Sequence, residues 1–110
     1  MSDDPLLGSF EELVLLSVAR LGENAYGMGV RRDLVERTGR DVNIGAVYAT
    51  LSRLEAKSFL SVEESTGGAA RGGRRRKSYR LLPGGITALR EAHRANRAMW
   101  TGLDPDALRA

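Results

Sequence analysis

Apolar residues recur every three or four positions over residues 9–21, which is the spacing of a helix that buries one face. A Ser-x-x-Glu pattern at residues 9–12 predicts a capping box, in which both side chains bond free backbone N–H groups. A second segment with helical spacing covers about residues 25–37. Gly27 and Gly29 lower its helix propensity, so we expect them to serve close packing.

A third helix is predicted over about residues 44–57, because its apolar positions share one face and Asn43 is a favourable N-cap. A fourth is predicted over about residues 84–103. Pro83 suits its first turn, and Asp104-Pro105 would end it. These segments make the chain mainly helical.

Apolar and polar residues alternate twice between the last two helices, over residues 60–63 and 79–81, as they do in strands. The segment between them is rich in Gly and Arg, which predicts a hairpin with a long tip. Three helices followed by a basic hairpin is the order of a winged helix-turn-helix. The expected fold is therefore mainly α with a small β-hairpin (α+β), with a winged helix-turn-helix over residues 1–83 and a C-terminal dimerisation helix and tail over 84–110.

Charge is distributed unevenly along the chain. The 110 residues hold 17 Lys and Arg against 14 Asp and Glu, a net charge of +3. Between Asn43 and Arg80, eight cations and three anions give 8 − 3 = +5, so the rest of the chain is slightly negative. A local excess of this kind is typical of a surface that binds a polyanion, and it points to nucleic acid.

The outer face of the third helix carries small residues, which let a helix backbone approach a groove wall closely. Ser52 can bond a phosphate or a base edge, Tyr48 suits a phosphate, and Arg53 suits either guanine or phosphate. The alternative is a solvated outer face without a partner. The basic run at the hairpin tip favours DNA contact, because guanidinium groups pair well with phosphate oxygens and fit the minor groove.

The predicted DNA-binding residues are Asn43, Gly45, Tyr48, Ala49, Ser52, Arg53, Arg71, Arg74, Arg75, Arg76 and Lys77. The basic tip could instead be solvated surface. It could also be an Arg-Gly-rich element that binds single strands, but that interpretation leaves the preceding helices without a role.

The fourth helix has an apolar face that a small domain has little means to cover, and this predicts a dimer interface. The predicted interface residues are Ile86, Leu89, Ala92, His93, Asn96, Met99, Trp100 and Leu103. The alternative is that the helix folds back onto the first helix as core. In the dimer interface, Asn96 would set the register of the two helices. Trp100 is expected either to anchor the dimer or to stack a small apolar or aromatic effector between subunits.

Three stretches, "LGSFEELVLLSVARLGENAYG", "GAVYATLSRLEAKSFL" and "GGRRRKSYRLLPGG", resemble in order and spacing the PadR-like family of small bacterial transcriptional regulators. The resemblance covers about residues 6–103. It implies a winged-helix repressor that dimerises through its C-terminal helix and releases DNA when a small molecule or another signal changes the dimer.

Under this resemblance Tyr48 matches the tyrosine of the recognition helix. Gly73-Arg74, Lys77 and Tyr79 match the basic wing and the strand that leads out of it. The chain departs from the family pattern at Leu82, where members usually carry threonine. The start of the last helix therefore lacks the expected hydroxyl cap.

The sequence argues against an enzyme. There is no cysteine, and the acidic pairs near the N-terminus have no base or nucleophile beside them. The stretch of residues 67–73 lacks the Gly-Lys-Ser/Thr of a phosphate loop and precedes a strand instead of a helix. We therefore expect no cofactor and no metal site. The chain has neither the roughly 18 consecutive apolar residues of a membrane span nor a cationic leader, so a cytoplasmic location is expected.

Two other functions remain compatible with the pattern. One is a winged-helix protein-interaction module whose basic wing binds an acidic protein partner. The other is a nucleic-acid binder without sequence preference. Steep salt dependence combined with preference for one duplex sequence would favour the regulator over both.

Overall fold

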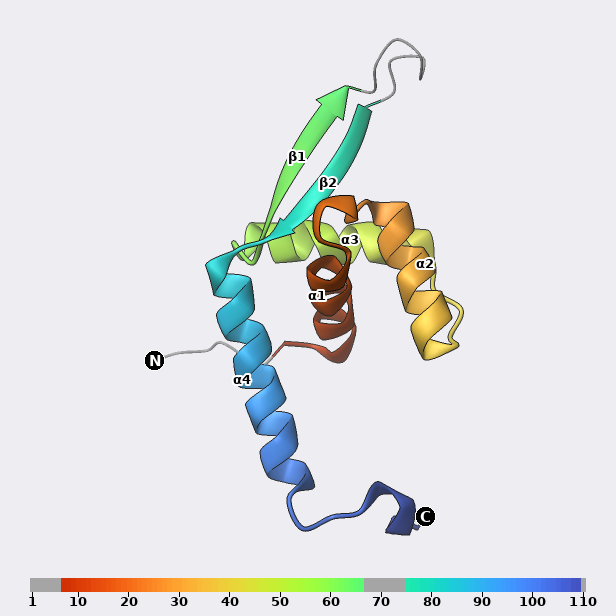
Figure 1. Ribbon diagram of the computed structural model, residues 1–110, viewed down its shortest axis with the longest axis vertical. Helices are drawn as coiled ribbons and strands as arrows, with labels where there is room; N and C mark the ends of the chain where they lie inside the picture. Colours follow the sequence, from red (N-terminus) through yellow and green to blue (C-terminus); the bar gives the residue numbers. More distant parts are fainter. Residues whose placement is uncertain (1–6, 67–74, 110) are drawn as a thin grey trace.

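The computed structural model describes residues 7–66 and 75–109. Within them, three helices form a compact body, from which a two-stranded hairpin and a fourth helix extend in opposite directions (Figure 1). The elements are α1 (Ser9–Leu21), α2 (Gly27–Thr38), α3 (Ile44–Ala56), β1 (Leu60–Thr66), β2 (Arg75–Leu81) and α4 (Pro83–Trp100). This is the mainly helical α+β architecture of a winged helix, as predicted.

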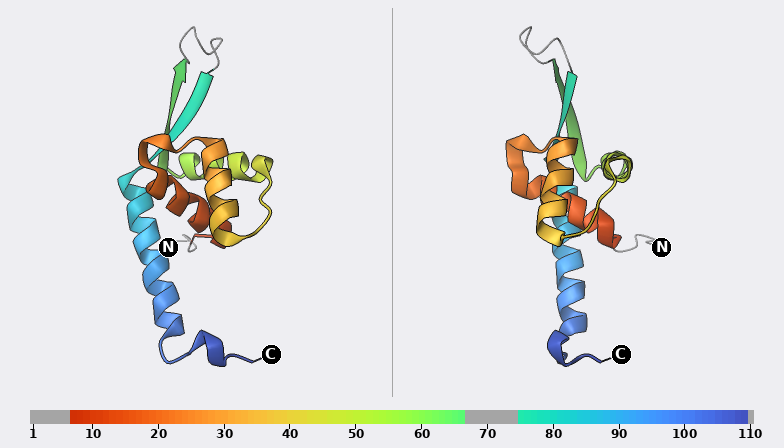
Figure 2. Two further views of the ribbon diagram at one scale, coloured as in Figure 1. Left: turned by 45° about the vertical axis from the view of Figure 1, so that its right-hand side comes forward. Right: turned by 90° about the vertical axis from the view of Figure 1, so that its right-hand side faces the viewer.

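Helix α1 is the central helix of the body and contacts α2, α3, β2 and α4 (Figure 2). The core is formed by side chains that are less than one tenth exposed, namely Val14, Leu15, Val18, Ala25, Val30, Leu34, Val42, Val47, Leu51, Leu54, Leu60 and Tyr79. The apolar face that helical spacing predicts for this helix does not include Leu15; its residues are Phe10, Leu13, Val14, Ser17, Val18 and Leu21. Leu15 is buried because α1 has neighbours on more than one side.

The cap of α1 was predicted one residue too late. Gly8, and not Ser9, is the N-cap, and Ser9 is already helical. The carboxylate of Glu11 accepts the backbone N–H of Gly8 at 3.1 Å, so this glutamate has the role that was expected of Glu12. The helix start therefore uses half of a capping box, since glycine has no side chain to contribute the other half.

Helix α2 begins two residues later than its apolar spacing suggested. Residues 22–24 form a short 3₁₀ turn, and Tyr26 then pairs with Ser78 as an isolated antiparallel bridge. The backbone N–H of Tyr79 donates to the carbonyl of Ala25 at 2.9 Å. Residues 25–26 thus extend the hairpin sheet, because they lie within backbone hydrogen-bonding distance of β2.

Strands β1 and β2 pair in register from Leu60 with Leu81 to Thr66 with Arg75. Both strands are longer than the segments of residues 60–63 and 79–81 that the alternating pattern predicted. Consequently Arg75, Arg76 and Lys77 lie in β2 and not at a loop tip. The outer halves of the strands project beyond the core, so backbone pairing continues there without an apolar face. Arg71 and Arg74 lie outside the described residues.

Helix α4 starts at Pro83 after Leu82, whose side chain makes no capping hydrogen bond, as expected where the hydroxyl is missing. The helix ends at Trp100, three residues earlier than predicted. Gly102 adopts a φ of +86°, a left-handed conformation that glycine allows at low cost. Leu103 therefore lies beyond the helix and not on its apolar face. No helix in residues 7–66 and 75–109 is long and apolar enough to cross a membrane.

Candidate nucleic-acid interface

Helix α3 presents one fully buried face and one exposed face of small side chains. Val47, Leu51 and Leu54 have no exposed surface. On the opposite side Gly45, Ala49 and Ser52 are exposed. This division places the predicted DNA-binding residues of the helix on its solvent side.

Asn43 fixes the start of this helix. Its Oδ1 accepts hydrogen bonds from the backbone N–H groups of Gly45 at 2.7 Å and Ala46 at 3.3 Å. The residue is thus a structural cap, as its position predicted. Because Oδ1 is occupied by the cap, only the amide nitrogen of Asn43 would be available to DNA.

Tyr48 lies at the edge of the exposed face with 42% of its surface accessible. Its ring packs against Gly27 at the start of α2, where a β-carbon would collide with it. This contact explains one of the two glycines that weaken α2 by propensity. The contact with α2 also fixes the direction in which the Tyr48 hydroxyl points.

Arg53 is exposed, yet its guanidinium is engaged within the domain. It donates to Thr50 Oγ1 at 3.0 Å and lies 3.8 Å from the carboxylate of Glu11. Lys57 Nζ donates to the same carboxylate at 2.9 Å. To reach a base, Arg53 would have to leave this cluster. The sequence pattern does not reveal that Glu11 would compete with DNA for Arg53, because the two residues are more than forty positions apart.

The charge of Glu11 is stabilised in this cluster. Burial raises the pKa of the Glu11 carboxyl, but hydrogen bonds from Lys57 and Gly8 and the positive charges of Lys57 and Arg53 outweigh that effect and lower it below its ordinary value. Glu11 is therefore an anion near neutral pH. Its carboxylate holds Arg53 of α3 and Lys57, the residue that follows this helix, close to α1.

The hairpin β1–β2, called the wing below, is basic but not uniformly so. In the register of the two strands, Lys77 lies opposite Glu64 and Arg76 lies opposite Ser65. The guanidinium carbon of Arg76 lies 4.5 Å above the centroid of the Tyr26 ring, a cation–π distance. Arg76 therefore attaches the wing to the turn before α2. Tyr79, at the base of β2, is 5% exposed and belongs to the core.

The face of α4 predicted to form a dimer divides in the structure. Ala92 is buried and Leu89 packs partly against the domain's own core, so these two belong to the alternative in which the helix folds back onto α1. His93 and Asn96 are exposed. Large apolar surface remains exposed at Ile86, Met99, Trp100 and Leu103, of which Met99 at 78% is the most exposed.

Leu16 was not among the predicted interface residues. It is 41% exposed and lines a groove between α1 and α4 together with Leu89, His93 and Arg97. It directly follows the buried Leu15 and lies at the edge of the contact between α1 and α4, so α4 covers it only in part. Helical spacing in the sequence does not reveal it, because the partner element is distant in the chain.

Comparison with known proteins identifies the fold's relatives. The family model described as the transcriptional regulator PadR-like family matches residues 15–91. The chain belongs to the PadR-like family. The search of curated proteins found no match.

Solved PadR structures resemble the chain over most of its length. A PadR family transcriptional regulator from Eggerthella lenta is 30% identical, with a TM-score of 0.68 over 83% of this chain and 77% of its own. A PadR family regulator from Clostridium difficile is 26% identical, with a TM-score of 0.63 over 81% and 91%. A PadR-like regulator from Bacillus cereus, 21% identical with a TM-score of 0.67 over 84% of both chains, shares the fold. This PadR-like chain is a winged-helix, DNA-binding transcriptional regulator.

Proposed function

We propose that the protein is a homodimeric repressor that binds a near-palindromic operator. In this proposal α3 enters the major groove and the wing contacts the backbone or minor groove beside it. The observation that carries it is the exposed face of small residues on α3, opposite a face with no exposed surface. A helix backbone with small side chains can approach base edges closely.

The second copy is proposed to bind through α4 and the adjoining part of α1. Exposed apolar side chains occur on both elements, at Leu16, Ile86, Met99 and Trp100. Isologous pairing of these surfaces would cover them and hold two α3 helices in phase with successive grooves. In this scheme the DNA contacts come from residues 1–83, and α4 within residues 84–110 holds the dimer together with the adjoining face of α1. A small molecule or another signal that changes the dimer would release the operator.

The proposal is tested by selecting fragments from genomic DNA with the purified chain and measuring their affinity against random duplexes. We expect a preferred, nearly symmetrical sequence. We also expect the logarithm of the binding constant to fall with the logarithm of salt concentration. Replacing Arg74 and Arg75 by Ala should reduce the slope by about 1 for each phosphate that the variant no longer neutralises. Binding to an acidic protein with indifference to DNA would contradict the proposal.

A matched pair of variants locates the interface. Ala49→Asp puts an anion on the exposed face of α3, where it would repel phosphate. Ala107→Asp makes the same change at an exposed position in the tail. We expect the first variant to lose operator binding and the second to keep it. Equal affinity of the two variants would move the interface away from α3.

A further inference from the structure

Phe59, which lies between α3 and β1, is hydrogen-bonded through its backbone to both sides of the junction between α3 and α4. Its N–H donates to the carbonyl of Leu54 in α3 at 3.0 Å, and its carbonyl accepts the N–H of Leu82, the residue before α4, at 3.0 Å. The start of α4 lies beside the turn in which α3 ends (Figure 1). The end of the proposed recognition helix is therefore joined directly to the start of the proposed dimerisation helix.

Gly85, in the first turn of α4, is buried against this same backbone. A β-carbon at this position would lie 2.8 Å from Leu81 Cδ1 and 3.2 Å from the carbonyl carbon of Phe59, and it would collide with the Phe59 carbonyl oxygen. That carbonyl cannot turn aside, because it accepts the hydrogen bond from Leu82. A larger residue at position 85 would therefore push α4 away from the end of α3.

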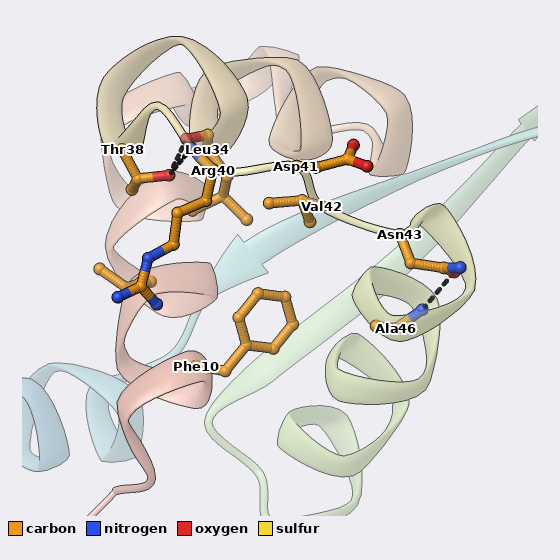
Figure 3. Close-up of a pocket in the computed structure, with 9 residues that line it drawn as sticks. Phe10, Leu34, Thr38, Arg40, Asp41, Val42, Asn43 and Ala46 are labelled. Atoms are coloured by element: carbon orange, nitrogen blue, oxygen red, sulfur yellow. Dashed lines mark hydrogen bonds between the residues drawn. The ribbon is translucent and has the colours of Figure 1, made fainter.

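The start of α3 is also held within the domain. Asn43 Oδ1 accepts the backbone N–H of Ala46 at 3.3 Å (Figure 3). The carbonyl of Val42, the preceding residue, accepts a hydrogen bond from Arg31 Nε of α2 at 2.8 Å. One face of the helix is fully buried in the core. Because α3 is fixed at its start, at its end and along one face, a larger residue in place of Gly85 would move α4 and not α3.

The expected displacement of α4 is comparable with the rise of one base pair. Carbon atoms pack best about 3.5 Å apart, and the contact of a β-carbon at Gly85 with Leu81 falls short of this by about 0.7 Å. Leu89, one helical turn further on, packs against the core and acts as the fulcrum. At about 1.5 Å per residue, 0.7 Å over this turn becomes about 2 Å at Trp100. Two-fold symmetry doubles it to about 4 Å, against about 3.4 Å for one base pair.

We propose that Gly85 is a positioning residue for operator recognition. Its close packing against Phe59 sets the angle at which α4 leaves the domain, and this angle sets the distance between the two α3 helices of the dimer. The operator feature that Gly85 selects is the spacing between the half-sites, and not the sequence of either half-site. This inference rests on the proposed function, because it requires a dimer held by α4 that binds two half-sites.

Pulsed electron spin resonance measures the distance between the two α3 helices without DNA. The chain has no cysteine, so Ser52→Cys, at an exposed position of α3, attaches one spin label to each subunit of the full chain. Gly85→Ala should change the mean distance between the labels by about 2 to 4 Å. Gly84→Ala is the control, because its β-carbon would come no closer than 3.3 Å to its nearest neighbour, the carbonyl oxygen of Ser58.

The labels also separate this inference from the proposed function. A mean distance that is the same in Gly85→Ala as in the parent would overturn the role of Gly85 while leaving the dimer in place. Absence of dipolar coupling in the parent would contradict the dimer itself, and both proposals would then fail.

Unlabelled protein tests the consequence for DNA. The probes are duplexes with two copies of the half-site that the parent selects, separated in steps of one base pair. Gly85→Ala should move the preferred spacing by at least one base pair, and it should bind an isolated half-site as tightly as the parent does. A variant that is merely destabilised would lose affinity at every spacing and keep the same preference. That result would overturn the proposal.

A second variant decides the question if Gly85→Ala does not fold. Ser58 has a φ of +62°, a conformation that glycine adopts at low cost, so Ser58→Gly keeps the fold. The substitution loosens the turn that carries Phe59. The distribution of label distances should then be broader than in the parent, and neighbouring half-site spacings should be bound with more similar affinities. A distribution of unchanged width would overturn the proposal.

Discussion

Tyr48 of α3 packs its ring against Gly27, the first residue of α2. A β-carbon built on Gly27 would lie 2.6 Å from the Tyr48 hydroxyl oxygen and closer still to the ring. Because Gly27 has no side chain, the Tyr48 ring of α3 can lie directly against the start of α2. The same tyrosine is predicted to contact phosphate, so the glycine determines where that contact is made.

Gly27→Ala should therefore separate DNA binding from stability. The Tyr48 side chain can swing into solvent, and alanine favours the helix, so the free energy of unfolding should change by less than about 1 kcal/mol. Operator affinity should fall about tenfold, because the hydroxyl no longer meets its phosphate. Thermal unfolding and DNA titration measure the two effects. Gly29→Ala is the control, since its β-carbon would meet only ordinary contacts, the nearest being 3.4 Å from the carbonyl oxygen of Asn24.

Releasing Arg53 from Glu11 should strengthen DNA binding. Glu11→Gln removes the carboxylate that lies 3.8 Å from Arg53 and accepts a hydrogen bond from Lys57. Arg53 and Lys57 are 58% and 44% exposed, whereas Glu11 is only 14% exposed, so the stability cost should be about 1 kcal/mol. We expect operator affinity to rise several-fold at low salt. Glu12→Gln, the same change of charge one residue along, should have a smaller effect. If the two variants bind equally well, Arg53 is not restrained by Glu11.

Asp33 connects α2 to α1 and should contribute to acid sensitivity. It accepts hydrogen bonds from the buried Ser17 hydroxyl at 2.7 Å and from Arg37 at 2.8 Å. Burial raises the pKa of Asp33, but these hydrogen bonds and the positive charges of Arg37 and Arg20 outweigh it and lower the pKa. Because the native pKa lies below the ordinary value of 3.8, the stabilisation is complete above that pH and disappears as pH falls through the native pKa.

Asp33→Ala should accordingly cost about 1 to 3 kcal/mol at neutral pH, mainly because the Ser17 hydroxyl is left without its acceptor. The difference from the parent should shrink in acid. Urea unfolding over a series of pH values measures both effects. In the background of Ser17→Ala the cost of Asp33→Ala should be smaller. A difference that stays constant down to low pH would show that the Asp33 charge does not stabilise the fold.

The dimer proposal is tested at Met99, which is more exposed than the residues first predicted around it. Leu89 is unsuitable because it packs partly against the domain's own core. Met99→Asp would set like charges across a two-fold seam at a cost of several kcal/mol. Sedimentation should then show monomers, and operator affinity should collapse. Met28→Asp, an equivalent change on α2 at a side chain that is 53% exposed, should leave the sedimentation unchanged. A Met99→Asp protein that sediments as a dimer would place the interface elsewhere.

The sequence by itself determined the helices, the hairpin and the exposed face of α3. These features follow from local rules: apolar residues three or four apart share a helical face, Asn43 caps the turn that follows it, and a stretch rich in Gly and Arg separates two alternating segments. Each rule involves neighbours in the chain, so no tertiary information is needed to apply it. The family resemblance depended on the same segments in the same order.

Only the tertiary structure decided which side chains are free. Glu11 reaches Arg53 and Lys57, and Arg76 stacks on Tyr26. The structure also divided the apolar face of α4 between α1 and solvent. These outcomes depend on contacts between residues far apart in the chain. Their distances are set by how the helices pack together, and the periodicity of each helix carries no information about its neighbour.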